Sequence, residues 1–182
     1  MTIRPLLRIP ALLTALAASA VTGALVSCES VDDDRIPYAE VRLTFLTVGD
    51  WNIHGVKGDA ADSKRYIFTS SERIPADFPY TALDRTGFGG LLLATDVLGE
   101  LYVYDLACPV EARPTVRIEV APGATEARCP QCGSTFDIYG ATHGNPLTGP
   151  AADRGYALTR YHVHSGGPTE YRVITRATAS KF

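Results

Sequence analysis

Three cysteines in the middle of the chain are the residues best suited to metal chemistry. Cys108 lies in the run Leu106-Ala-Cys-Pro-Val110, and after eighteen further residues comes the run Cys129-Pro-Gln-Cys-Gly-Ser-Thr-Phe-Asp137. Two sulfurs three positions apart in a C-P-x-C-G turn converge on one point. The proline and glycine fix the turn, so that backbone N–H groups can face the thiolates. This pattern favours tetrahedral thiolate coordination of zinc or iron.

The fourth cysteine, Cys28, belongs to an N-terminal targeting signal. Two arginines precede an apolar run from Ile9 to Val26 that contains no charge, and the run ends in Leu25-Val-Ser-Cys28. This order is typical of a secretory signal peptide over residues 1–27. The L-V-S-C ending resembles the lipobox of bacterial lipoproteins, which implies that Cys28 is acylated and becomes the first residue of the mature chain. The alternative is a signal-anchor helix in which Cys28 has no special role.

Removal of the leader changes the composition of the chain. Removing 27 of the 182 residues leaves 155, and the net charge changes from −3 to −5 because the leader carries two arginines and no acid. The remaining length is enough for one domain with its own core. A negative net charge gives no electrostatic reason to bind nucleic acid. Only one long apolar stretch exists, which excludes a multi-span membrane protein.

Residues 28–37 are expected to form an acidic tether between Cys28 and the domain. They contain the polar run Glu29-Ser-Val-Asp-Asp-Asp-Arg35, which predicts a solvated segment. An acidic run directly after a lipidated cysteine also resembles the surface-export signals of Bacteroidetes lipoproteins. The alternative is an ordinary flexible tether.

Residues 38–182 are predicted to form a single all-β domain. Apolar and polar residues alternate with period two at 41–45, 116–120 and 161–164, which places one face of each strand on a core. Denser apolar runs at 91–93 and 101–104 fit strands buried on both faces. A last strand is expected at 171–175, and a loop at 50–62. Short strands between Gly/Pro turns favour a sandwich or small barrel.

From about Thr86 to Thr175 the chain resembles the Rieske iron–sulfur domains. That family carries C-x-H and C-x-x-H loops at a similar separation, and G-S-x-F-D and a G-P-A turn commonly follow the second loop. Here G-S-T-F-D is Gly133–Asp137, G-P-A is Gly149–Ala151, and Leu158–Val163 is similar to the family's closing strand. The resemblance implies small stacked antiparallel sheets with two metal-binding loops at one tip.

The ligand positions depart from that family. Its two cysteines bind one iron of a [2Fe–2S] cluster, and its two histidines bind the other iron. Cys108 and Cys129 occupy the cysteine positions, giving C-x-V and C-x-x-C loops in place of C-x-H and C-x-x-H. Val110 stands in place of the first histidine and cannot ligate iron. Cys132 stands in place of the second histidine and offers a thiolate.

Three interpretations of the site remain open. The first is a modified [2Fe–2S] centre on the three cysteines with a fourth ligand from elsewhere, for which Glu111 and His143 are the nearest candidates. The second is a single zinc or iron ion on the same cysteines and one other group. The third is a metal-free fold with a disulfide, which export permits.

The leading hypothesis is a ferredoxin-like electron carrier or redox accessory protein, anchored by lipid to a bacterial membrane. The outer membrane is the expected location, on its periplasmic or cell-surface side, and a redox protein is the expected partner. The protein is not expected to be an enzyme by itself, because the chain is too short for the catalytic iron domain of ring-hydroxylating oxygenases. The alternative is a structural or interaction lipoprotein that uses the same fold with zinc, a disulfide or no metal.

Overall fold

The computed structural model describes residues 31–58, 62–96, 98–165 and 172–175. The predicted signal peptide and Cys28 lie outside these residues. The strands are β1 (Val41–Phe45), β2 (Asp62–Phe68), β3 (Arg73–Ile74), β4 (Arg85–Thr86), β5 (Leu91–Thr95), β6 (Leu101–Asp105), β7 (Glu126–Arg128), β8 (Thr135–Asp137), β9 (Pro146–Thr148), β10 (Arg160–Ser165) and β11 (Arg172–Thr175), and the helices are α1 (Val48–His54) and α2 (Gly149–Arg154).

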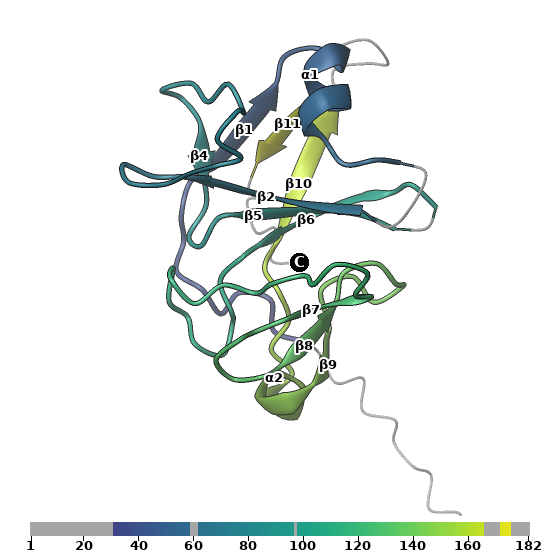
Figure 1. Cartoon of the computed structure of the whole chain (residues 1–182). Helices are drawn as coiled ribbons and strands as arrows, with labels where there is room; N and C mark the ends of the chain where they lie inside the picture. The colour runs from purple at the N-terminus through teal and green to yellow at the C-terminus, as the bar shows by residue number, and fades with distance from the viewer. Residues whose placement is uncertain (1–30, 59–61, 97, 166–171, 176–182) are drawn as a thin grey trace, which may run out of the picture.

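The strands form two antiparallel sheets. The larger has eight strands in the order β3-β2-β5-β6-β10-β11-β1-β4, and the smaller has the order β7-β8-β9. The large sheet curls so that β4 returns to β2, where the backbone N–H of Phe68 donates to the Thr86 hydroxyl at 3.0 Å. In Figure 1 the small sheet lies against one side of the curled sheet, and α1 and α2 mark opposite ends of the molecule. The predominantly β fold agrees with the sequence prediction.

Strand β5 lies between two apolar clusters, and its five residues are all buried. Leu91 and Leu93 point into the cluster enclosed by the curled sheet. Leu92 and Ala94 point into a second cluster, shared with the small sheet. The dense apolar run at 91–93 therefore belongs to a strand covered on both faces, as predicted.

The structure corrects three local expectations. Part of the expected loop at 50–62 is helix α1, which the Thr47–Asp50 capping box begins. The G-P-A run opens helix α2 rather than a turn, because proline is readily accommodated in the first turn of a helix. Residues 116–120 make only isolated bridges, at Arg117 and Glu119, instead of a continuous strand.

The described part of the expected tether, residues 31–37, is attached to the domain. Asp32 donates its N–H to the Gly155 carbonyl at 2.8 Å and accepts from the Ala157 N–H at 2.9 Å. Ile36 is buried, and the Arg35 guanidinium lies 4.3 Å from the centre of the Tyr156 ring. The acidic side chains are exposed, as expected. The backbone, however, pairs with the domain, so the domain begins before residue 38.

The carboxylate of Asp105, at the end of β6, is fully buried. It accepts hydrogen bonds from the N–H groups of Phe88, Gly89 and Ala107 at 2.8–2.9 Å, and from the Tyr161 hydroxyl at 2.6 Å. Burial raises the pKa of Asp105, while these four hydrogen bonds act in the opposite direction. One side chain thus fixes the turn before β5, the exit of β6 and strand β10.

We expect Asp105→Asn to lower the free energy of unfolding by about 3 kcal/mol, because an amide cannot accept all four hydrogen bonds and turns an N–H toward a buried donor. Urea unfolding followed by circular dichroism measures the change. Asp153→Asn, at an exposed position of α2, is the matched control and should change stability by less than about 0.5 kcal/mol. Equal midpoints for the two variants would contradict this role of Asp105.

Candidate functional site

The structure brings the three predicted cysteines together. Their sulfur atoms all lie within 4.8 Å of one another, and the Sγ atoms of Cys108 and Cys132 are 3.7 Å apart. Cys108 and Cys129 are fully buried, whereas Cys132 is half-buried. All three are free thiols. An ion with tetrahedral Zn–S bonds of about 2.3 Å separates its ligand sulfurs by about 3.8 Å. The group can therefore hold a metal ion.

Cys108 is positioned by a short ladder with the segment that follows its own loop. Its N–H donates to the Val116 carbonyl at 2.9 Å, and the Ile118 N–H donates to the Leu106 carbonyl at 2.8 Å. This pairing explains why residues 116–120 alternate like a strand although they form only bridges. The ladder holds Cys108 beside the apolar cluster that the two sheets share.

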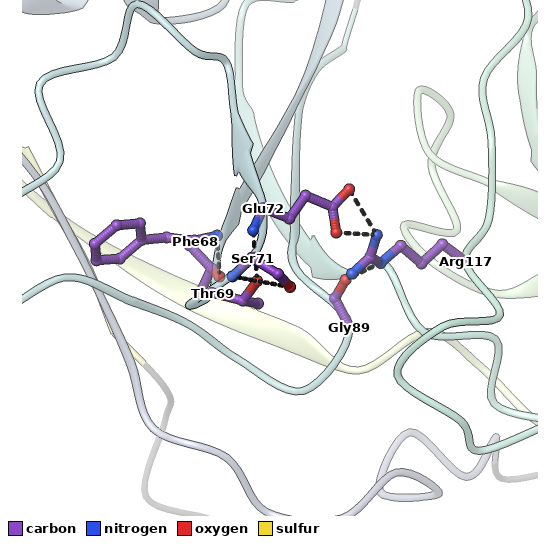
Figure 2. Close-up of polar contacts among 7 residues, drawn as sticks. Phe68, Thr69, Ser71, Glu72, Gly89 and Arg117 are labelled. Atoms are coloured by element: carbon purple, nitrogen blue, oxygen red, sulfur yellow. Dashed lines mark hydrogen bonds and ion pairs between the residues drawn. The ribbon is translucent and has the colours of Figure 1, made fainter.

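Arg117 ties this ladder to the large sheet (Figure 2). Its Nε donates to the Gly89 carbonyl at 2.6 Å, and its Nη1 donates to both carboxylate oxygens of Glu72, at 2.9 and 3.2 Å. Glu72 lies in the turn between β2 and β3, which the Thr69 side chain braces by accepting from the N–H groups of Ser71 and Glu72. Through Arg117, the segment paired with the first cysteine loop is therefore held against the large sheet.

The second loop, residues 129–134, is closed by two backbone hydrogen bonds. The Cys129 N–H donates to the Ser134 carbonyl at 2.9 Å, and the Gly133 N–H donates to the Cys129 carbonyl at 3.0 Å. Gly133 has a φ of +75°, a conformation that costs glycine little. This is the tight turn that the C-P-x-C-G pattern predicted.

Ser134 joins the second loop to helix α2. Its fully buried hydroxyl accepts from the Ala151 N–H at 3.0 Å and lies 3.2 Å from the Cys132 sulfur. Gly149 packs closely on this residue, because an added Cβ would lie 3.0 Å from the Ser134 Cα. From the sequence, Ser134 was expected only as part of the G-S-T-F-D motif. Because Ser134 lies two residues after Cys132, its position in the sequence could have identified it as a residue of the site.

The pKa values of two of the thiols are shifted in opposite directions. Burial in apolar surroundings raises the pKa of Cys108, although backbone N–H groups of Glu111 and Val110 oppose the shift. Burial also acts to raise the pKa of Cys132, but hydrogen bonds from Ser134 and the neighbouring thiols outweigh it, and the pKa is lowered. Cys132, the more exposed of these two thiols, therefore ionises before Cys108.

Neither candidate for a fourth ligand joins the cysteines. Within the described residues, the group of possible metal ligands contains the three cysteines alone. The Glu111 carboxylate accepts instead from Arg113 at 3.0 Å and from Gln131 at 2.8 Å. This second contact joins the two cysteine loops at their outer ends. His143 stacks on Tyr102, with ring centroids 3.7 Å apart.

No family model, no curated protein and no solved structure matches the chain. No helix in the described part of the chain combines the length and the hydropathy needed to cross a bilayer. The resemblance to Rieske domains stays a prediction from motifs such as Gly133–Asp137 and Gly149–Ala151.

We expect Ser134→Ala to slow alkylation of Cys132 by iodoacetamide severalfold near neutral pH. The thiolate loses a hydrogen bond, so its pKa rises and the midpoint of the pH–rate profile moves upward. Mass spectrometry of the reduced, metal-free protein measures the rate at each cysteine. Thr148→Val is the control, because its hydroxyl bonds Thr135 and should leave the profile unchanged. A wild-type profile in Ser134→Ala would show that Ser134 does not act on Cys132.

Proposed function

We propose that the chain is an exported bacterial lipoprotein whose β domain holds one thiophilic metal ion on Cys108, Cys129 and Cys132. The mature protein is anchored through acylated Cys28 to a membrane, taken to be the outer membrane. It acts as an accessory or interaction module rather than as an enzyme. The observation that carries this proposal is the 3.7 Å separation of two sulfurs within a compact three-thiol group, which matches one edge of a metal-centred tetrahedron.

A two-iron cluster fits this group less well. Such a cluster needs four protein ligands, two on each iron, and the described residues supply three. In the Rieske arrangement, Cys108 and Cys132 would also bind different irons, and ligands of different irons are farther apart than one tetrahedral edge. Their separation of 3.7 Å supports a single shared ion. The number of ligands and the distance between the sulfurs therefore favour the single-ion interpretation over the [2Fe–2S] interpretation.

The three cysteines come from two parts of the fold, so an ion bound to them would have a structural effect. Cys108 follows β6 of the large sheet, whereas Cys129 and Cys132 precede β8 of the small sheet. An ion bound to all three would join the two sheets at the edge of the apolar cluster that they share. A structural metal contributes its binding free energy to folding, because the unfolded chain has no preformed site.

A redox role is the second candidate, and the backbone N–H groups that bond the Cys108 sulfur favour it. Hydrogen bonds to thiolate sulfur help to set the reduction potential of iron centres. An iron ion here would supply one-electron chemistry. Cys132, the half-buried ligand, would be the side on which a redox partner approaches.

We expect protein purified anaerobically from a native host to contain one zinc or iron ion per chain and no acid-labile sulfide. Cys129→Ser should lose the ion and should be less stable than the wild type to thermal unfolding. Elemental analysis, a sulfide assay and a count of free thiols measure these quantities. Ser71→Ala, in an exposed turn, is the control and should keep the ion.

Two other results would contradict this proposal in different ways. Two irons and two sulfides per chain would establish the cluster and the electron-carrier hypothesis. No metal, together with one free thiol among the three, would establish the disulfide interpretation and a purely structural module.

A further inference from the structure

We propose that the lipid bilayer is the surface against which the end of the domain formed by β9 and α2 rests, so that the small sheet and the cysteine group occupy the membrane-proximal half of the protein. This inference rests on the acylation of Cys28 in the proposed function. The observation that carries it is the attachment of residues 32–36 to the domain, which leaves little free chain between the anchor and the fold.

The attachment is built from backbone and side-chain contacts along the segment. Asp32 forms a parallel bridge with Tyr156, through the two hydrogen bonds of 2.8 and 2.9 Å described above. The Thr159 hydroxyl donates to the Asp33 carbonyl at 2.6 Å. Ile36 then enters the core with 4% of its surface exposed. Backbone pairing, a buried hydroxyl contact and a buried side chain together fix where the segment leaves the domain.

The point of departure lies beside α2. Asp32 pairs with the residues that directly follow this helix. The first turn of α2 in turn bonds Ser134, whose hydroxyl lies 3.2 Å from the Cys132 sulfur. A short series of contacts therefore joins the anchored segment, α2 and the cysteine group. In Figure 1, α2 and the small sheet lie at the end of the molecule opposite α1.

The distance available to the anchor follows from chain geometry. Cys28 precedes Asp32 by four residues, and an extended chain spans at most about 3.5 Å per residue, or about 14 Å in total. Acyl chains on Cys28 enter the bilayer, so Asp32 can lie no farther than this from the headgroup region. A free tether over residues 28–37 would instead allow the domain to turn in any direction.

The surface at this end is compatible with a lipid headgroup region. Val31 and Leu147 are exposed apolar side chains, with 41% and 47% of their surfaces accessible. Arg35 and Arg154 lie beside the Tyr156 ring. Apolar side chains together with arginine and an aromatic ring are residue types that suit the interface of a bilayer. The opposite end, at α1, also exposes apolar side chains, among them Leu46, Val48 and Ile53, so the short attached segment, and not the surface composition, selects the end that faces the bilayer.

The test is a paramagnetic relaxation measurement on the acylated mature protein in nanodiscs with and without a gadolinium-chelating headgroup lipid. Amide signals of 147–149 and 151–155 should lose most of their intensity when gadolinium is present, whereas those of Val48–His54 should keep theirs. A variant with about twelve Gly/Ser residues inserted between Ser30 and Val31 should lose this difference, because the longer linker frees the orientation. Cys28→Ser should show no attenuation at either end.

The outcomes separate the inference from the proposal beneath it. Equal attenuation at both ends of the acylated wild type, or stronger attenuation at α1, would overturn the inference and leave the lipoprotein assignment intact. Mass spectrometry that finds Cys28 unacylated would overturn both. A difference between the two ends that persists unchanged in the insertion variant would show that the anchor does not set the orientation, and would also overturn the inference.

Discussion

The buried carboxylate of Asp105 is the interaction on which the arrangement of this protein most depends. A charge removed from water is tolerated only where donors replace its hydration, and here four donors from three segments do so. Because two of those donors precede β5 and one lies in β10, the carboxylate holds β6 in place against both of its neighbours in the sheet. Gly87 is part of the same constraint, since an added Cβ would lie 2.8 Å from the carboxylate.

The position of Cys108 depends on the hydrogen bonds of Asp105. Asp105 bonds the Ala107 N–H, and Cys108 follows immediately, paired with the Val116 carbonyl. Arg117 then fastens the paired segment to Gly89, whose N–H is held by the same carboxylate. The second cysteine loop reaches the site by another route, through Ser134 and the first turn of α2. The two loops also contact each other, through the Glu119–Arg128 backbone bridge and the Glu111–Gln131 hydrogen bond. Together these contacts place three thiols at one point, and contacts that orient the ligands strengthen metal binding.

The apolar cluster between the two sheets determines the surroundings of the three thiols. Cys108 and Cys129 pack among Leu106, Ile118 and Phe136 with no exposed surface. Such surroundings disfavour a free thiolate and favour either neutral thiols or thiolates neutralised by a cation. Only Cys132 reaches the edge of the cluster. The site is therefore closed to solvent at Cys108 and Cys129 and partly exposed at Cys132.

The sequence by itself determined the β character of the domain, the strand buried on both faces at 91–93 and the identity of the sulfur donors, because period-two alternation and the C-P-x-C-G turn act over a few residues. It placed α1 and α2 in a loop and a turn, since short capped helices lack a long apolar period. Only the tertiary structure decided that Cys108 and Cys132, 24 residues apart, lie 3.7 Å from each other, that Glu111 and His143 stay outside the group, and that the acidic segment joins residues 126 positions away. Each of these depends on contacts between distant segments, which no local pattern encodes.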